Sequence, residues 1–487
     1  MSTHLVQACA AVVGPSNVLV DEADKQAFEQ DVWNRYRGNA ALVARPGTVD
    51  EVSKLLVVAA EHGASVVPQG GNTGLVAGSI PDETGRQIVL SLSRINRIRH
   101  VEPRGDFVIA EAGVVLADIQ KAAEQVDRYF PLSLGAEGSC QIGGNIATNA
   151  GGLNVLRYGM TRGLILGLEV VLADGTIWNG LRSVRKDNTG YDLKEIFVGS
   201  EGTLGIITAA SLRLLPPQRD RQTIWLAVAS AEAAVDLFAR FRSHFGDLIS
   251  SFELIHSNGV ELAVEYLEGC RRPLSDRHQW HVLIELAWAL PTGLREQTET
   301  FLEQLFEYGL CEDGTIAESE MQRLNMWRIR EGQSEAARKR GVVIRSDVAV
   351  SIERLPGLLH AMEEWTKAQD TDILFMPFGH VGDGNLHCNC LVSPHVVGEI
   401  EPRLLEALYD EVTQLGGSIS AEHGIGRLKS YSVGKRKSDV ELRLAHSIKR
   451  LLDPCSILNP GVIFGTASSE AAPAAALVEA PLRTKTA

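Results

Sequence analysis

The chain has 487 residues, with 47 basic and 61 acidic side chains and a formal net charge of −14. A chain of this length is too long for one hydrophobic core, so we expect two or three domains. The acidic balance disfavours nucleic acid or an anionic membrane as a partner, and an anionic small molecule would need a local basic patch.

The N-terminal residues carry no recognisable targeting pattern. They contain neither a basic segment before an apolar core nor an Arg-rich amphipathic stretch, and the first charged residues are Asp21, Glu22 and Asp24. The charge-free run 138–156 is rich in Gly and Asn and predicts loops rather than a transmembrane segment. The seven cysteines are scattered without a Cys-x-x-Cys pair, which suits free thiols in a reducing compartment. We therefore expect a soluble, cytoplasmic protein.

Glycine-rich segments characterise the first half of the chain, at residues 66–74, 135–152 and 199–205. Closely spaced glycines let backbone N–H groups approach a phosphate, and the interleaved Asn, Ser and Thr add donors. Each segment alone could be an ordinary turn, but three in one domain favour a large diphosphate cofactor. The Gly-x-Gly-x-x-Gly dinucleotide fingerprint and the Gly-x-x-x-x-Gly-Lys-Ser/Thr phosphate-binding loop are both absent from the sequence.

Strand-like and helix-like stretches alternate from residue 41 to residue 215, where the sequence Pro-Pro-Gln-Arg-Asp at 216–220 predicts a linker. The elements predicted after it are a strand at 223–228, a helix at 231–243, a strand at 281–288, a helix at 294–308, a hairpin at 374–392 and a helix near 397–415. This order predicts an α+β domain in which helices back an antiparallel sheet. The tail from Thr466 is rich in Ala, Ser and Pro, and we expect it to be disordered.

A basic face is predicted on the elements before the hairpin. Arg330 and Ser334 are four residues apart on a helix expected over 325–340 and share a face. After Gly341 the alternation predicts a strand that buries Val342, Ile344, Val348, Val350 and Ile352 on one side. Arg345 and Asp347 lie on the other side, where they could simply form a solvated ion pair.

The strongest single pattern surrounds Asp383-Gly384, the dipeptide preferred in a two-residue type I′ turn because both central positions need positive φ. A turn centred there pairs His380 with His387. Their Cβ atoms would lie about 4.5–5.5 Å apart, close enough for both imidazoles to bind one divalent cation. Asn389 would share the face of His387. The two histidines alone could equally be solvated residues of a polar hairpin.

Glu422 and His423 could complete this site. Two His and one Glu leave a fourth position open, which is typical of a catalytic metal site rather than a structural one. Because neighbours in a regular strand point to opposite faces, both side chains reach one site only if the backbone turns there. Gly424 and Gly426 make such a turn easy.

Six motifs occur in a fixed order along the chain. They are PQGGNTG at 68–74, GGNIATN at 143–149, GTLGIIT at 202–208, GHVGDGNLH at 379–387, AEHG at 421–424 and LNPG at 458–461. Together they resemble the FAD-dependent D-2-hydroxy-acid dehydrogenases of the vanillyl-alcohol-oxidase superfamily, and most of all the D-2-hydroxyglutarate dehydrogenase branch. The resemblance covers roughly residues 36–464, and six motifs in register are more specific than any single pattern.

The resemblance implies an α+β fold and non-covalent FAD. The implied domains are a PCMH-type FAD-binding domain of two α+β subdomains at 1–217, an α+β substrate and metal domain with an antiparallel sheet at 218–420, a segment at 421–465 that returns to the flavin, and a disordered tail at 466–487. Relatives that attach their flavin covalently often have His at the position of Asn72, so FAD should dissociate here. The expected FAD-binding residues are Pro68, Gly70, Gly71, Asn72, Thr73, Gly74, Gly135, Gly138, Ser139, Gly143, Gly144, Asn145, Thr148, Asn149, Gly151, Gly205, Ile207 and Asn459.

The resemblance also implies roles around the substrate. His380, His387 and Glu422 match ligands of Zn²⁺ or another divalent metal, Asn389 matches a contact to the substrate hydroxyl, and His423 matches the general base, itself in contact with substrate. Arg330, Ser334 and Arg345 match an Arg, Thr and Lys trio that holds the distal carboxylate of a dicarboxylic substrate. Because two of the three differ from the family pattern, the length of the substrate is less defined than the reaction.

The expected activity is oxidation of D-2-hydroxyglutarate, or of D-malate, to the 2-oxo acid, with the hydride passing to flavin N5. The resemblance suggests an electron-transferring flavoprotein or a quinone-linked acceptor as the partner, and it is compatible with a homodimer. The alternatives are a D-lactate or glycolate dehydrogenase of the same superfamily and a flavin-binding protein without turnover.

Overall fold

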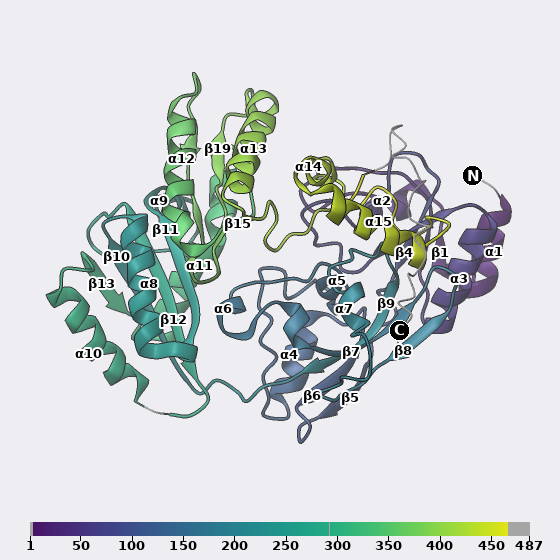
Figure 1. The fold of residues 1–487 in the computed structure, drawn as a ribbon, viewed down its shortest axis with the longest axis horizontal. Coiled ribbons are helices and arrows are strands. Elements are labelled where there is room, and N and C mark those ends of the chain that lie inside the picture. Colours follow the sequence, from purple (N-terminus) through teal and green to yellow (C-terminus); the bar gives the residue numbers. More distant parts are fainter. Residues whose placement is uncertain (1–2, 292, 466–487) are drawn as a thin grey trace, which may run out of the picture.

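The structure is a computed structural model that describes residues 3–291 and 293–465. Figure 1 shows two lobes: the first contains the N-terminal part of the chain, and the second contains the middle part. The last described helices return to the first lobe, where they lie beside the N-terminal elements. The predicted tail at 466–487 lies outside the described residues.

The first lobe contains two sheets. In the first sheet, β2 and β4 are parallel neighbours, as are β4 and β3, so the helix between β2 and β3 serves as a crossover. Its elements are α1 (Thr3–Val13), β1 (Val18–Leu19), α2 (Glu22–Glu29), β2 (Ala40–Ala44), α3 (Val49–Glu61), β3 (Ser65–Gln69) and β4 (Gln87–Ser91), with strand order β1-β2-β4-β3. Helix α3 begins at Thr48, whose side chain accepts a hydrogen bond from the Glu51 backbone N–H.

The second sheet of this lobe is antiparallel, with strand order β5-β6-β9-β7-β8. Its elements are β5 (Ile98–Glu102), β6 (Phe107–Glu111), α4 (Leu116–Glu124), α5 (Ile142–Ala147), α6 (Val155–Tyr158), β7 (Ile165–Val171), β8 (Ile177–Gly180), α7 (Lys194–Phe197) and β9 (Ile206–Arg213). The predicted glycine-rich segments lie in both parts of this lobe: 66–74 covers the end of β3 and the loop after it, 135–152 contains α5, and 199–205 precedes β9.

The second lobe is built on a five-stranded antiparallel sheet of order β13-β10-β12-β11-β17. The elements around it are β10 (Asp220–Val228), α8 (Ala231–Phe245), β11 (Ile249–His256), α9 (Ser257–Tyr266), β12 (Trp280–Trp288), α10 (Leu294–Glu307), β13 (Asp313–Ile316), α11 (Glu320–Arg338), α12 (Leu355–Lys367), β17 (Phe378–His380) and α13 (Val397–Gln414). Short strands form two smaller sheets, β14 (Val342–Ile344) with β19 (Cys390–Val392) and β16 (Leu374–Phe375), and β15 (Val348–Ala349) with β18 (Asn385–Leu386). The predicted α+β class is confirmed.

Alternation along β10 explains why this central sheet is covered on both faces. Ile224, Leu226 and Val228 enter one hydrophobic core, whereas Trp225 and Ala227 enter a second core on the opposite face. Helices α8 and α10 pack on the first face, and α9 and α11 contribute to the second. The apolar side of the segment after Gly341 also packs in the first core, as predicted.

The predicted type I′ hairpin is wrong. Residues 381–383 form a 3₁₀ turn, and within the dipeptide only Gly384 has a positive φ, of 80°. The bridge across the loop pairs Phe378 with His387, so His380 does not face His387 in the register expected. The two arms join different sheets instead, β17 pairing with β11 and β18 with β15. Long-range strand pairing therefore overrides the local turn preference.

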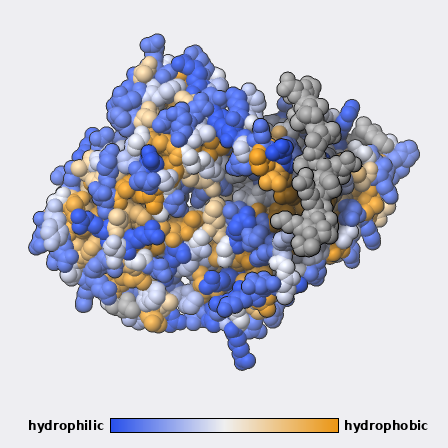
Figure 2. Space-filling view, viewed as in Figure 1, coloured by the Kyte–Doolittle hydropathy of each residue, from blue (hydrophilic) through white to orange (hydrophobic). Residues whose placement is uncertain are grey.

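The C-terminal helices α14 (Ser430–Arg436) and α15 (Asp439–Leu452) pack against the first lobe (Figure 1). Leu458 forms a parallel bridge with Val66, and the Asn459 N–H donates to the Val66 carbonyl, which anchors the returning segment beside β3. In the part of the chain described, no helix is both long and apolar enough to cross a membrane. In the space-filling view of the same side (Figure 2), hydrophilic and hydrophobic residues are interspersed over the second lobe.

Candidate functional site

A cavity in the first lobe lies between the glycine-rich segments. The predicted cofactor residues that line it are Pro68, Gly70, Gly71, Asn72, Thr73, Gly74, Gly143, Gly144, Asn145, Thr148, Gly205 and Ile207. Gly135, Gly138, Ser139, Asn149, Gly151 and Asn459 are not among its lining residues. The lining also includes residues that were not among the predicted FAD-binding residues, such as Ser79, Gln141, Glu201 and Gly202.

Close backbone approach shapes this cavity. A Cβ on Gly71 would lie 2.1 Å from the Ser139 carbonyl oxygen, and one on Gly202 would lie 2.3 Å from the ring of Pro68. Side chains are therefore excluded where the loops meet. Gln141 Oε1 and Asn145 Oδ1 are buried without a hydrogen-bond partner among the described residues. Two orphaned acceptors beside glycine-rich loops suit a polar ligand that carries N–H or O–H groups, and such loops can also bind a phosphate.

Some predicted cofactor residues hold the loops in place. The Asn72 amide donates to the carbonyls of Ala27 and Gln30 at 3.2 and 3.0 Å, and its oxygen accepts from Ser79 at 3.0 Å. The Asn459 amide donates to two backbone carbonyls, one of them that of Glu201. Direct contact of these two side chains with a cofactor stays a prediction.

The structure brings His380, His387 and Glu422 together despite the changed hairpin register. One ligand atom from each lies within 4.8 Å of the others, which is a spacing that suits one metal ion. The His380 and His387 ring centroids are 6.0 Å apart. His380 is the last residue of β17, His387 follows β18, and Glu422 comes from the loop after α13.

Both histidines direct their Nε2 atoms to this group, because a hydrogen bond fixes each Nδ1. His380 Nδ1 donates to Glu253 at 2.5 Å, and His387 Nδ1 donates to the Ser346 carbonyl at 3.1 Å. An acceptor on one ring nitrogen is the usual support of a metal-binding histidine. Burial lowers the pKa of His387 to about 3, so this imidazole is neutral and able to bind a cation.

Glu253 links the candidate metal-ligand group, which consists of His380, His387 and Glu422 and is called the metal-ligand group below, to Arg330. It is fully buried in β11, and its other carboxylate oxygen accepts from Arg330 Nε at 2.6 Å. Burial raises the pKa of Glu253, but Arg330 and His380 outweigh that effect and lower it to about 2. Burial lowers the pKa of His380, yet Glu253 raises it to about 9. Without a metal ion the buried carboxylate is thus neutralised by two cations.

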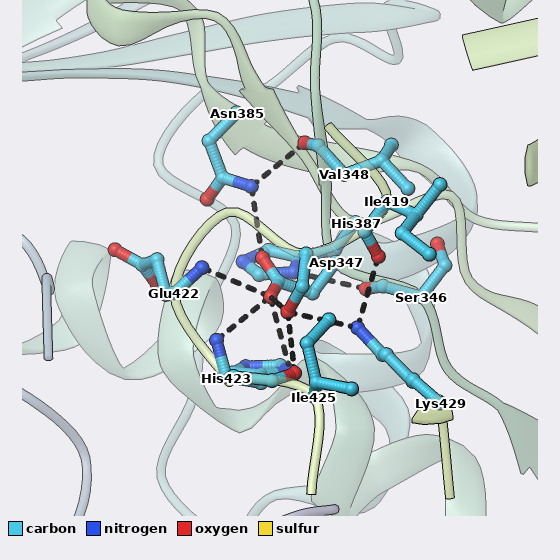
Figure 3. A network of polar contacts seen from close by, with 12 residues as sticks. Ser346, Asp347, Val348, Asn385, His387, Ile419, Glu422, His423, Ile425 and Lys429 are labelled. Atoms are coloured by element: carbon cyan, nitrogen blue, oxygen red, sulfur yellow. Dashed lines mark hydrogen bonds and ion pairs between the residues drawn. The ribbon is translucent and has the colours of Figure 1, made fainter. Parts of the chain in front are cut away.

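Asp347 organises the loop that carries Glu422 and His423. Its Oδ2 accepts the backbone N–H groups of both residues, at 3.0 and 2.8 Å. Figure 3 shows Asp347 at the centre of this network, with His387, Glu422 and His423 around it. His423 Nδ1 lies 3.6 Å from the same oxygen. The His423 ring stacks on the ring of His387, with 5.7 Å between the two ring centroids. Burial raises the pKa of Asp347, but His423 and Lys429 hold it well below its usual range.

The first lobe holds the same loop from its other side. Glu201 accepts the N–H groups of Ile425 and Gly426, both at 2.8 Å, and the Gly152 N–H donates to Glu422 at 2.7 Å. The predicted turn is confirmed, since Gly424 and Gly426 have φ values of 79° and 53°. His423 lies on the cavity wall and also beside the metal-ligand group. The loop therefore joins two sites that the sequence placed in separate domains.

The three residues predicted to hold a distal carboxylate differ in burial and in the side chains that they contact. Arg330 is buried, with one edge occupied by Glu253 and its guanidinium carbon 4.4 Å from the Phe378 ring centroid. Ser334 is half-buried on α11, one turn further along. Arg345 stacks on Trp33 at 3.8 Å, so the alternative of an Arg345–Asp347 ion pair is not what the structure has. Their contact with substrate stays a prediction.

The side chain of Asn389 is held by a hydrogen bond from Ser346, which follows β14. Its Oδ1 accepts the Ser346 backbone N–H at 3.1 Å, which leaves the amide nitrogen to donate toward a ligand.

Sequence reasoning missed Glu253 and Glu201. A lone carboxylate in the apolar strand sequence Ile-Ser-Ser-Phe-Glu-Leu-Ile-His was the available signal for Glu253. Glu201 had none beyond its place in a glycine-rich loop.

Comparison with known proteins identifies both halves of the chain. Residues 40–180 match the family "FAD binding domain", and residues 217–463 match "FAD linked oxidases, C-terminal domain". A probable mitochondrial D-2-hydroxyglutarate dehydrogenase of Oryza sativa subsp. indica is 40% identical over 454 residues, covering 92% of this chain and 80% of the relative. A putative mitochondrial D-lactate dehydrogenase of Schizosaccharomyces pombe is 38% identical over 478 residues, covering 94% and 90%.

Solved structures share the fold at lower identity. The 4-ethylphenol oxidase of Gulosibacter chungangensis superposes with a TM-score of 0.74 at 17% identity, covering 95% of this chain and 97% of that one. The predicted PCMH-type architecture is thereby confirmed.

Proposed function

The chain belongs to the FAD-linked oxidases, within the D-2-hydroxyglutarate dehydrogenase family, and we propose that it oxidises D-2-hydroxyglutarate or D-malate with the help of a divalent metal ion. The observation that carries the proposal is the position of His423. His423 lines the cavity of the FAD-binding lobe, and its ring stacks on His387, which also belongs to the cluster of His380, His387 and Glu422. A substrate hydroxyl held at the metal would therefore face both a base and the cofactor.

The residues present fit both groups. The glycine loops and the orphaned acceptors of Gln141 and Asn145 would hold FAD, without a covalent bond because Asn72 is not nucleophilic and its side chain is bound within the lobe. The nitrogen and oxygen ligand set suits zinc, and it also admits manganese or cobalt. When bound, FAD accepts a hydride and a divalent cation lowers the pKa of a coordinated hydroxyl.

The residues around the substrate would then do three things. Asn389 would orient the hydroxyl through its amide nitrogen, and His423 would take the hydroxyl proton. Because His423 Nδ1 lies toward Asp347, Nε2 is the nitrogen left for that proton. The buried Asp347 carboxylate would stabilise the imidazolium that results, and it would hold the ring in place through the backbone of its loop.

The remaining parts of the proposal rest on the sequence. We propose that an electron-transferring flavoprotein or a quinone-linked acceptor takes the electrons. The domain limits at 217/218 and 420/421, a homodimer and a cytoplasmic location stay predictions, and the relatives described above are named as mitochondrial.

A D-lactate dehydrogenase is the second candidate. Two observations favour it: the Schizosaccharomyces pombe relative is named a putative D-lactate dehydrogenase, and Ser334 and Arg345 depart from the family trio. The two candidates differ in whether the enzyme requires a second carboxylate on its substrate.

Replacing Arg345 by alanine separates these candidates. A hydrogen bond to a charged group contributes roughly 1.5–3 kcal/mol, so kcat/KM for D-2-hydroxyglutarate should fall about ten- to a hundred-fold. D-lactate has no second carboxylate, and its kcat/KM should barely change. Steady-state kinetics with both substrates and their L enantiomers provide the measurement, and the L enantiomers should not react. Equal losses on both D substrates would favour the D-lactate candidate.

A further inference from the structure

Three hydrogen-bond donor groups meet where the two lobes approach one another. The guanidinium carbons of Arg338 and Arg345, both from the second lobe, lie 4.1 and 3.8 Å from the ring centroid of Trp33 in the first lobe. Arg338 is the last residue of α11, and Arg345 follows β14. Cation–π contact accounts for the stacking but satisfies none of the N–H groups.

Most of these N–H groups lack an acceptor among the described residues, and of the two arginines Arg338 is exposed whereas Arg345 is half-buried. Trp33 Nε1 is buried without a hydrogen-bond partner among the described residues. Within the same part of the chain, neither Arg338 nor Arg345 has a carboxylate within 4.0 Å, and the only side-chain hydrogen bond of the pair runs from Arg338 Nε to the Ser334 carbonyl. Burial lowers the pKa of Arg345 to about 10, with Arg338 and Arg35 adding to the effect. Guanidinium and indole groups can only donate, so the partner that would satisfy all three is an anion.

The cluster of Trp33, Arg338 and Arg345 is connected to the metal-ligand group through Ser346, the residue after Arg345. Ser346, next to Arg345, donates its N–H to Asn389 and accepts from His387 Nδ1. On α11, Arg338 lies two turns beyond Arg330, which corresponds to about 12 Å along the helix axis. Arg345 is thus joined through Ser346 to Asn389 and His387, two residues of the candidate substrate site.

Trp33 is held in position before any ligand binds. The Asp31 carboxylate accepts backbone N–H groups from Trp33, Arg35 and Tyr36, at 3.3, 2.7 and 2.7 Å. The Arg35 side chain forms an ion pair with Glu401 on α13, which ties the loop to the second lobe. The backbone of Trp33 is therefore fixed by this turn, and its ring is held by the two guanidinium contacts.

We propose that Trp33, Arg338 and Arg345 form a composite site for the substrate carboxylate that is remote from the metal, and that Trp33 and Arg338 determine the preference for dicarboxylates. This inference rests on the function proposed above and adds two residues, one of them from the FAD-binding lobe. A contact that only stacked the lobes together would not require a buried, orphaned indole N–H beside the half-buried and unpaired guanidinium of Arg345.

Arg338→Ala and Trp33→Phe test the proposal. Arg338→Ala should raise KM for D-2-hydroxyglutarate about ten-fold with little change for D-lactate, which is the loss expected for one charged hydrogen bond. Trp33→Phe keeps the aromatic face and removes only the N–H, so it should raise the same KM roughly three- to ten-fold. Arg340→Ala, an exposed arginine just after α11, is the matched control and should leave both substrates unchanged.

Binding to the holoenzyme provides a readout without turnover. Calorimetric titration with glutarate, a diacid that lacks the hydroxyl, should show about ten-fold weaker binding to Arg338→Ala, whereas butanoate should bind wild type and variant alike. Equal effects of Arg338→Ala and Trp33→Phe on D-lactate and D-2-hydroxyglutarate, or glutarate binding that ignores both substitutions, would overturn the proposal. If wild type oxidises no D-2-hydroxy acid yet glutarate binding depends on Arg338, the anion site stands and the proposed reaction fails.

Discussion

Replacing Glu422 by glutamine should abolish turnover, lower bound metal from about one ion per chain to a small fraction of that, and leave the flavin spectrum unchanged. The substitution removes the negative charge from the metal-ligand group, but the amide oxygen can still accept the Gly152 N–H, so the loop is preserved. His380→Ala should act in the same way, because it removes the imidazole that Glu253 orients. Elemental analysis and flavin absorption of the purified variants provide the measurement.

Glu296→Ala is the control for this experiment. Glu296 is exposed in the first turn of α10, away from the metal-ligand group, and its loss should change neither metal content nor activity. Full activity of wild type after exhaustive chelation and dialysis would contradict the metal-dependent account.

Asp347→Ala should destabilise the protein and inactivate it together. The buried carboxylate accepts the backbone N–H groups of Glu422 and His423 and the side-chain amide of Asn385. Removing a buried partner from such a network costs roughly 3–5 kcal/mol. Asp347→Asn keeps the size of the side chain and should lose less stability, but it should still inactivate because the imidazolium of His423 loses its counter-charge. Denaturant unfolding and kcat together separate these effects.

The pH dependence of this difference follows from the depressed pKa of Asp347. A carboxyl group whose folded pKa lies below its unfolded value of about 3.9 contributes stability above that pH and loses it as the pH falls further. The stability gap between wild type and Asp347→Asn should therefore be constant above about pH 5 and shrink in acid. The exposed Asp370→Asn should show no such gap. A gap that widens below pH 4 would contradict a charged, network-bound Asp347.

Regular elements of the second lobe were predictable because their periodicity is strong. The helix expected at 231–243 is α8 at Ala231–Phe245, and the strand expected at 281–288 is β12 at Trp280–Trp288. Strand β12 is buried on both faces, with Val282, Ile284 and Leu286 in one core and Leu283 in the other, so its sequence is a largely apolar run. Local turn preference failed at Asp383-Gly384, where pairing with β11 and β15 determined the path of the chain.

The clustering of His380, His387 and Glu422 was predictable from the motifs, but the residues that support them were not. His380, His387 and Glu422 meet as expected even though the hairpin register that suggested the pair is wrong. Glu253 is 127 residues from His380 in the sequence, and the two become neighbours only through the pairing of β11 with β17. Trp33 comes from the other lobe, so no local pattern could place it on Arg345.

Anaerobic reduction of the flavin by D-2-hydroxyglutarate, followed with and without the divalent ion, tests the central claim most directly. A substrate hydroxyl held at the metal would lie between His423 and the flavin cavity. The flavin of the holoenzyme should therefore bleach rapidly with D-2-hydroxyglutarate and not with its L enantiomer. Metal-stripped enzyme should stay yellow until zinc or manganese is restored. Rapid bleaching of the stripped enzyme, or no bleaching of the metal-loaded enzyme by any D-2-hydroxy acid, would contradict it.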